Sequence, residues 1–155
     1  MKVSDDIGDN KDSSANVDSD QPIVAERPMY FDYNDTWDGA SDAMGIPSTS
    51  RTFFIAEGCT QQNFDTYYCI ENANATTATV DIKFMLGDGR TPSVRHTIAP
   101  HSRLTIKVND EVGVGTGQDV SAKLTSSVPI TVERPMYFNC DTCVGGHVGT
   151  AYGID

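Results

Sequence analysis

The residues of this chain best suited to chemistry are its cysteines and histidines. Four cysteines form two close pairs, Cys59 with Cys69 and Cys140 with Cys143, and His147 follows the second pair. An even number of cysteines in local pairs favours disulfide bonds in an oxidising compartment. Cys59 and Cys69 flank a turn-like segment, so adjacent strands would bring them into bonding range. We therefore expect a disulfide between them.

Three chemistries stay open for Cys140 and Cys143: a local disulfide, two free thiols, or metal binding with His147. A structural zinc site normally has four ligands. This stretch supplies three, so metal binding is the least favoured of the three chemistries and we assign no metal ligand.

The remaining polar residues form no catalytic pattern. His96 alternates onto an apolar face, and His101 follows Pro100 in a predicted turn. No Ser–His–Asp or Cys–His spacing occurs, and no glycine-rich phosphate loop precedes a helix. Acids such as Asp81 and Asp88 are scattered rather than paired as general acid and base. The sequence therefore predicts a protein that is not an enzyme and needs no cofactor.

The charge of the chain narrows the range of partners. The 155 residues carry a formal net charge of −11, which disfavours nucleic acid and anionic membrane surfaces. No apolar run approaches the ~20 residues that a membrane-spanning helix needs. We therefore expect no nucleic-acid partner and no membrane insertion.

Two segments fit the N-glycosylation acceptor pattern, Asn34-Asp35-Thr36 and Asn74-Ala75-Thr76. The pattern is short and common. Asn74 lies in a predicted exposed turn and is the better candidate.

Apolar residues alternate along most of the chain. Val80, Ile82, Phe84 and Leu86 face one way with period two, which is typical of a half-buried strand. Similar alternation recurs every 8–12 residues or so, and no helical apolar pattern extends over ten residues. These features predict an all-β fold, an antiparallel Ig-like β-sandwich of about 7–8 strands with an extended N-terminal arm.

The chain divides into three parts. Residues 1–21 contain six Asp and no aromatic residue, so we expect an acidic flexible tail. Residues 22–50 are expected to hold one strand and a loop, a possible donor strand. Residues 51–155 are expected to form the sandwich.

One phrase is present twice. The two ten-residue copies begin at Pro22 and Pro129 and are identical at eight positions, at an offset of 107. The first copy is the expected assembly strand: Pro22, Ile23, Val24, Glu26, Arg27, Pro28, Met29, Tyr30 and Phe31. The second is expected to end the sandwich as its last strand: Ile130, Val132, Glu133, Arg134, Pro135, Met136, Tyr137 and Phe138.

The Glu-Arg dipeptide of each copy should fix the register of its strand. On an alternating strand, one member of Glu26-Arg27 and one of Glu133-Arg134 faces inward. A buried charge requires a partner, so we expect an ion pair or a contact with a backbone carbonyl. Pro28 cannot donate to a ladder, which predicts an edge strand or a bulge.

The chain also resembles a known family. The similarity covers about residues 22–149 and lies in an ordered set of phrases: Phe54-Ile55-Ala56-Glu57-Gly58-Cys59, Phe64 to Asn72, Met85-Leu86-Gly87-Asp88-Gly89, Ala99-Pro100-His101-Ser102-Arg103 and Glu-Arg-Pro-Met-Tyr-Phe. These resemble a tandem repeat of about 100 residues, the size of one small domain, found in large secreted or surface-attached prokaryotic proteins. The resemblance implies an extracellular or cell-surface location.

Two functional hypotheses follow. The first is a non-catalytic structural module that assembles with itself or with neighbouring repeat units, head to tail, by donation of the first signature strand. The alternative is a monomeric module that binds surface glycans or another surface polymer. Its candidate aromatic side chains are Trp37, Tyr33, Tyr67 and Tyr152.

Overall fold

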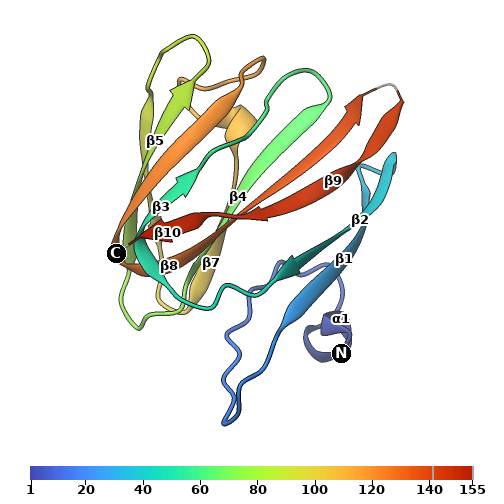
Figure 1. The fold of residues 1–155 in the computed structure, drawn as a ribbon, viewed down its shortest axis with the longest axis vertical. Coiled ribbons are helices and arrows are strands. Elements are labelled where there is room, and N and C mark those ends of the chain that lie inside the picture. The colour runs from blue at the N-terminus through green and yellow to red at the C-terminus, as the bar shows by residue number, and fades with distance from the viewer. Residues whose placement is uncertain (141, 155) are drawn as a thin grey trace.

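Nearly all of the regular secondary structure consists of antiparallel strands (Figure 1). The structure is a computed structural model and describes residues 1–140 and 142–154. Its elements are α1 (Val3–Ile7), β1 (Glu26–Tyr33), β2 (Trp37–Met44), β3 (Ser50–Ile55), β4 (Phe64–Asn72), β5 (Ala78–Leu86), β6 (Ser93–Ile98), β7 (Ser102–Lys107), the 3-10 turn η1 (Val108–Asp110), β8 (Val120–Cys140), β9 (Cys143–Thr150) and β10 (Tyr152–Ile154). The all-β prediction is confirmed, with ten strands rather than seven or eight.

The long strand β8 connects the two layers of the sandwich. Its first half pairs with β3 and β5, and its second half pairs with β4 and β9. One layer has the order β10-β3-β8-β5-β6, and the other has the order β7-β4-β8-β9. The register of β8 on β3 shifts between the Thr52–Thr125 and Ser50–Ile130 pairs. A β-bulge of this kind lets one strand bend from one layer into the other.

The core lies between these layers and follows the period-two pattern of the sequence. Val80, Ile82 and Phe84 are fully buried, as predicted, and Leu86 is nearly so. They pack with buried side chains from β3, β4 and β8, among them Phe53, Tyr68, Ile70, Leu124 and Val132. Burial of each large apolar side chain contributes about 1.5–3 kcal/mol. No residue of β1 or β2 belongs to this core.

Two boundaries predicted from the sequence are wrong. Residues 34–50 contain strand β2, and the second signature is followed by β9 and β10 rather than ending the sandwich. The missed strands lack apolar alternation because several of their inward positions are small. In β2 the inward positions include Gly39, Ser41 and Ala43, and a Cβ at Gly39 would lie 2.6 Å from the ring of Phe31.

The first 25 residues contribute no buried side chain. Their only helix is α1, which has five residues. Asp12 forms an ion pair with Arg103 of β7 at 3.1 Å, although the Asp12 side chain is 82% exposed. An exposed pair of this kind stabilises little. No helix in residues 1–140 and 142–154 is both long and apolar enough to cross a membrane.

Candidate assembly interface

The Glu-Arg-Pro-Met-Tyr-Phe part of the duplicated sequence lies in the first strand of a β-hairpin in both copies. The predicted assembly strand is shorter than expected, because β1 begins at Glu26 and Pro22, Ile23 and Val24 precede it. β1 pairs with β2 to make the first hairpin, and the second half of β8 pairs with β9 to make the second hairpin. Tyr33 lies opposite Trp37 at the end of the first hairpin. Cys140 lies opposite Cys143 at the equivalent place in the second. The duplication is therefore a two-stranded unit, and sequence reasoning identified only half of it.

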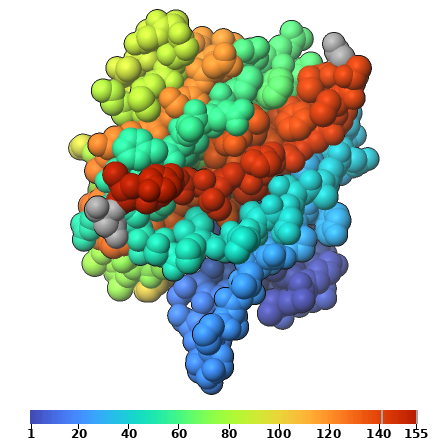
Figure 2. Space-filling view, viewed as in Figure 1, coloured from blue at the N-terminus to red at the C-terminus, as the bar shows by residue number. Residues whose placement is uncertain are grey.

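The first hairpin lies beside the second one (Figure 2). β2 runs along the outer edge of β9, where the Val148 N–H donates to Ser41 Oγ at 3.0 Å. The β1–β2 ladder is nevertheless a separate two-stranded sheet. Side chains, rather than a shared backbone ladder, hold the first hairpin on the sandwich.

Aromatic rings form most of this contact. Tyr33 stacks on Tyr137 with centroids 4.3 Å apart and planes 5° apart. Phe31 meets Tyr137 edge to face at 5.0 Å. The ring of Phe31 also fills the space over Gly146, where a Cβ would lie only 2.6 Å from Cζ. Such pairs contribute about 0.5–1.5 kcal/mol beyond the area they bury.

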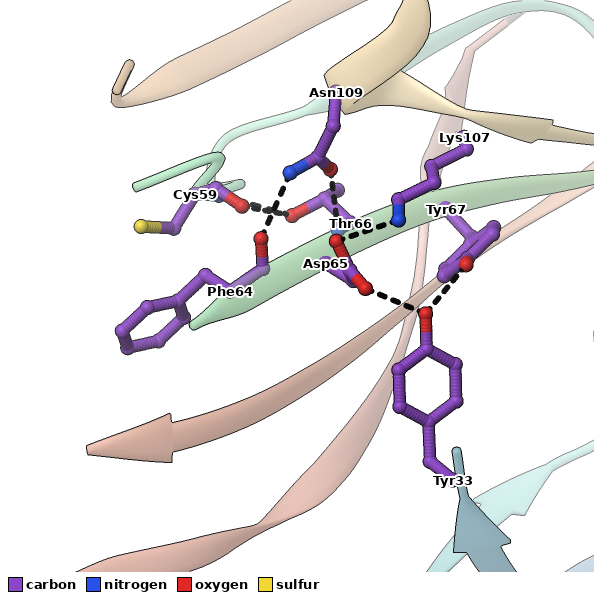
Figure 3. Close-up of polar contacts among 8 residues, drawn as sticks. All are labelled: Tyr33, Cys59, Phe64, Asp65, Thr66, Tyr67, Lys107 and Asn109. Atoms are coloured by element: carbon purple, nitrogen blue, oxygen red, sulfur yellow. Dashed lines mark hydrogen bonds and ion pairs between the residues drawn. The ribbon is translucent and has the colours of Figure 1, made fainter. Parts of the chain in front are cut away.

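A polar cluster anchors the end of β1 (Figure 3). The Tyr33 hydroxyl donates to Asp65 Oδ2 at 2.5 Å and lies 2.7 Å from the Tyr67 hydroxyl. Lys107 Nζ lies 2.9 Å from Asp65 Oδ1. Burial, followed by the hydrogen bond to Asp65, raises the pKa of Tyr33 well above its ordinary value of 10.0. The docked hairpin therefore requires a neutral Tyr33.

Asp65 and the β-strand around it are fixed by a second set of contacts. Asn109 Oδ1 accepts from the Thr66 N–H at 3.1 Å, and Asn109 Nδ2 donates to the Phe64 carbonyl at 2.8 Å. Thr66 Oγ1 in turn donates to the Cys59 carbonyl at 2.6 Å (Figure 3). The sequence offered no signal for Asn109, because this residue of η1 and its partner Thr66 are 43 residues apart in the chain.

An ion pair joins the two signature copies. Arg27 Nη2 of the first lies 3.0 Å from Glu133 Oε2 of the second. The inward residue of the second copy is Arg134, which is 6% exposed and lies 3.7 Å from Glu57. In the second copy one member of the dipeptide is thus buried, as expected, with Glu57 as the nearest carboxylate. In the first copy the expectation is wrong, because Glu26 and Arg27 are both exposed.

The outer edge of β1 has no strand partner within residues 1–140 and 142–154. The Gly45 N–H donates to the Ala25 carbonyl at 2.8 Å, so odd-numbered residues of β1 direct their backbone groups to β2. Pro28, being even-numbered, faces outward. In the second copy the equivalent edge is paired with β4, and that ladder is interrupted at Pro135. The same sequence is therefore paired on both sides in one copy and on one side in the other.

A Tyr33→Phe substitution tests the anchor. It removes the hydroxyl and is expected to weaken hairpin docking by about 1–2 kcal/mol. Amide hydrogen exchange of β1 and β2 measures this directly. Tyr30→Phe is the matched control, because the Tyr30 side chain is 83% exposed. Equal exchange in both variants would contradict the role given to Tyr33.

The same anchor predicts a pH dependence. Because the pKa of Tyr33 is higher when docked than its ordinary 10.0, docking is fully favoured below pH 10 and is lost as the pH rises above it. Above pH 10, the amide hydrogen-exchange rates of β1 and β2 should increase with pH more steeply than the base-catalysed exchange rate of an unprotected amide. In Tyr33→Phe this excess should shrink but not vanish, because Tyr137, whose pKa is also raised by burial, remains in the contact.

The expected disulfide between Cys59 and Cys69 is not formed, since both residues carry thiols. The Cys59 N–H donates to Thr66 Oγ1, three residues before Cys69 on the extended strand β4. Cys69 instead lies beside Thr105 of β7, with 3.9 Å between Sγ and Oγ1. Burial raises the pKa of both thiols, which keeps them protonated and unreactive. Spacing along the chain did not reveal that the two cysteines occupy different surroundings.

Cys140 and Cys143 lie directly opposite each other across the end of the second hairpin. Cys140 Sγ donates to the Cys143 carbonyl at 3.3 Å, and Cys143 carries a thiol. The part of the chain that the structure describes contains no group of three or more metal-ligating side chains.

Asn74 is not the exposed acceptor that the sequence suggested. Its Nδ2 donates to Asn72 Oδ1 at 2.8 Å and to the Pro129 carbonyl at 2.6 Å. A glycan on that nitrogen would replace one of its two N–H groups, so at least one of these two hydrogen bonds would be lost. Asn34, at the end of the first hairpin, is exposed.

The aromatic residues considered for glycan binding are mostly used within the protein. Tyr33 contacts Trp37 at 5.3 Å and Tyr67 at 6.3 Å. Tyr152 is 71% exposed and lies apart from them on β10. These side chains form no common exposed platform.

Comparison with known proteins supports the fold and no more. No family model matches the chain, and none of the curated proteins is a match. The crystal structure of Thermotoga maritima 1070 is similar, with a TM-score of 0.63 and 19% identity over 68% of this chain and 96% of that one. The Anabaena sensory rhodopsin transducer reaches a TM-score of 0.49 at 25% identity, over 57% of this chain and 83% of that one. The chain is thus similar in fold to nearly the whole of a solved protein.

Proposed function

We propose that the protein is a non-catalytic structural module that assembles with copies of itself by donating its first hairpin. The donated hairpin would occupy, on a neighbour, the surface formed by Tyr137, Gly146, Glu133 and Asp65, which we call the seat. The single observation that carries this proposal is the separation of the first hairpin from the sandwich ladders. An extracellular or cell-surface location is part of the proposal and rests on the family resemblance alone.

Exchange of the hairpin is favoured over pairing through the open edge of β1. Pro28 removes one outward donor from that edge. Asp32 lies directly opposite Asp38, and both are exposed, so the hairpin carries repelling charges that would also repel a second copy. Pro and like charges are the devices by which natural proteins prevent edge-to-edge association.

Exchange conserves the contacts that hold the hairpin. Tyr33, Phe31 and Arg27 would meet the same partners on a neighbour as they meet in their own chain. Residues 45–49 join the hairpin to β3 and span at most about 17 Å when extended. Each molecule has one donor hairpin and one seat, so head-to-tail exchange gives an open filament unless the rotation between subunits closes a ring.

Deletion of residues 1–45 tests the proposal, because it removes the donor and leaves the core intact. We expect loss of the concentration-dependent assemblies that the full chain forms, measured by light scattering and electron microscopy. A deletion of residues 1–21 removes the tail alone and should leave assembly unchanged. Filaments of the 1–45 deletion would refute the proposal, as would a full chain that stays monomeric at high concentration.

A further inference from the structure

The guanidinium of Arg134 is a buried cation with unusually weak partners. Its side chain is 8% exposed, whereas that of the equivalent Arg27 is 46% exposed. Arg27 has a carboxylate at 3.0 Å. The carboxylate nearest to Arg134 belongs to Glu57, at 3.7 Å, on a side chain that is 75% exposed. A distance of 3.7 Å between a nitrogen and an oxygen is too long for a hydrogen bond.

The other contacts of Arg134 do not satisfy its donors. A guanidinium has five N–H groups, and the hydrogen bond made by its side chain to the described residues goes to Met136 Sδ at 3.7 Å. Burial raises the pKa of Tyr68 above its ordinary value, and the nearby charge of Arg134 opposes this only in part. The buried Tyr68 hydroxyl finds no partner in residues 1–140 and 142–154. Within residues 1–140 and 142–154, no oxygen acceptor therefore lies at hydrogen-bond distance from the Arg134 guanidinium.

A crevice opens onto this guanidinium. Its volume is about 250 Å³, and its lining includes Phe54, Glu57, Arg134, Gly149 and Tyr152. A Cβ at Gly149 would lie 3.1 Å from Arg134 Nη2. The glycine therefore leaves open the space beside the two parallel N–H donors of the guanidinium, which we call the fork. One wall is apolar, because Phe54 and Ile55 of β3 and Ala56 contribute to it.

We propose that this crevice binds a small monocarboxylate, with the carboxylate on the fork of Arg134 and the apolar body against Phe54 and Tyr152. A guanidinium presents parallel donors that match a carboxylate. A single negative charge fits better than a phosphate dianion, because Glu57 is close by and the chain carries a net charge of −11. Without a ligand, Glu57 is the carboxylate nearest to the guanidinium, and a bound carboxylate would compete with it.

Titration of the full chain with sodium benzoate tests the site, with benzamide at the same concentration and ionic strength as the neutral control. We expect saturable chemical-shift changes at the amides of Gly149, Thr150 and Tyr152 at about millimolar benzoate, and none with benzamide. Equal responses to both compounds, or no saturable response to benzoate, would overturn the proposal.

Two variants separate this site from incidental binding. Arg134→Lys keeps the charge but loses the fork, and should weaken benzoate binding about tenfold. Glu57→Gln removes the competitor and should strengthen it about two- to fivefold. Because the Glu57 side chain is 75% exposed, this second variant remains informative if Arg134→Lys does not fold. Unchanged or weaker binding in Glu57→Gln would exclude the arrangement.

Discussion

A Gly146→Val variant is expected to release the first hairpin while leaving the sandwich folded. The Cβ added at Gly146 would lie 2.6 Å from Phe31 Cζ and 3.1 Å from Tyr137 Cδ1. Docking depends on the rings of Phe31 and Tyr137. If either ring moved to make room, the edge-to-face contact between them would be lost, and movement of Tyr137 would also disrupt its stack with Tyr33. Overpacking of this kind typically costs about 1–3 kcal/mol. That cost falls on the hairpin contact rather than on the core, which contains neither residue.

Limited proteolysis within residues 22–49 and hydrogen exchange of β1 and β2 measure the release. Gly145→Val is the matched control, because a Cβ there would lie 3.5 Å from Phe138, an ordinary contact. Proteolytic cleavage within residues 22–49 should accelerate in Gly146→Val but not in Gly145→Val. The far-ultraviolet circular dichroism spectra of both variants should match that of the parent. Equal protection of the hairpin in both variants would show that Phe31 does not depend on the glycine.

An Asn72→Asp variant is expected to lose about 3 kcal/mol or more of unfolding free energy. Asn72 is fully buried at the end of β4. Its Nδ2 lies within hydrogen-bond distance of the Thr76, Ile98 and Ala99 carbonyls, at 2.8, 3.2 and 3.0 Å. Aspartate has the same shape but turns this donor into an acceptor, so a buried carboxylate would face three carbonyl oxygens.

Urea unfolding measures the loss, and its pH dependence identifies the cause. A protonated carboxyl regains one donor, so the deficit relative to the parent should shrink as the pH falls. Asn16→Asp, in the exposed tail, should match the parent at every pH. A pH-independent deficit in Asn72→Asp would point to packing rather than to the lost donor.

The sequence predicted the core well and the interface poorly, for a physical reason. Strands such as β5 bury every second residue, and this pattern is local enough to be visible in the sequence. The seat depends on Phe31 fitting over Gly146, two residues that are distant in the chain and informative only when placed together. The sequence alone does not show which side chain lies above Gly146.

The cysteines and Asn74 illustrate a second limit. Short spacing suggested that Cys59 would meet Cys69, but an extended strand carries the two apart. The acceptor motif at Asn74 matched its pattern, yet Asn74 is held by Pro129, 55 residues later. In each case a local pattern is overridden by a contact made in the folded chain.

The duplication now has a structural meaning. Each copy of the Glu-Arg-Pro-Met-Tyr-Phe phrase is the first strand of a hairpin, and the two copies are joined by the ion pair between Arg27 and Glu133. In a tandem array, the first hairpin would stand where the closing hairpin of the preceding unit belongs. The boundary between units would then be the contact that we propose is exchanged between molecules.

The most direct test mixes two proteins that should each be unable to assemble alone. A chain lacking residues 1–45 has an open seat and no donor, whereas the Gly146→Val chain has a free donor and a blocked seat. Light scattering coupled to gel filtration should show a one-to-one complex in the mixture and monomers in each separate sample. The complex should vanish when the donor also carries Phe31→Ala. A mixture that stays monomeric would contradict hairpin donation, as would a complex that still forms when the donor carries Phe31→Ala.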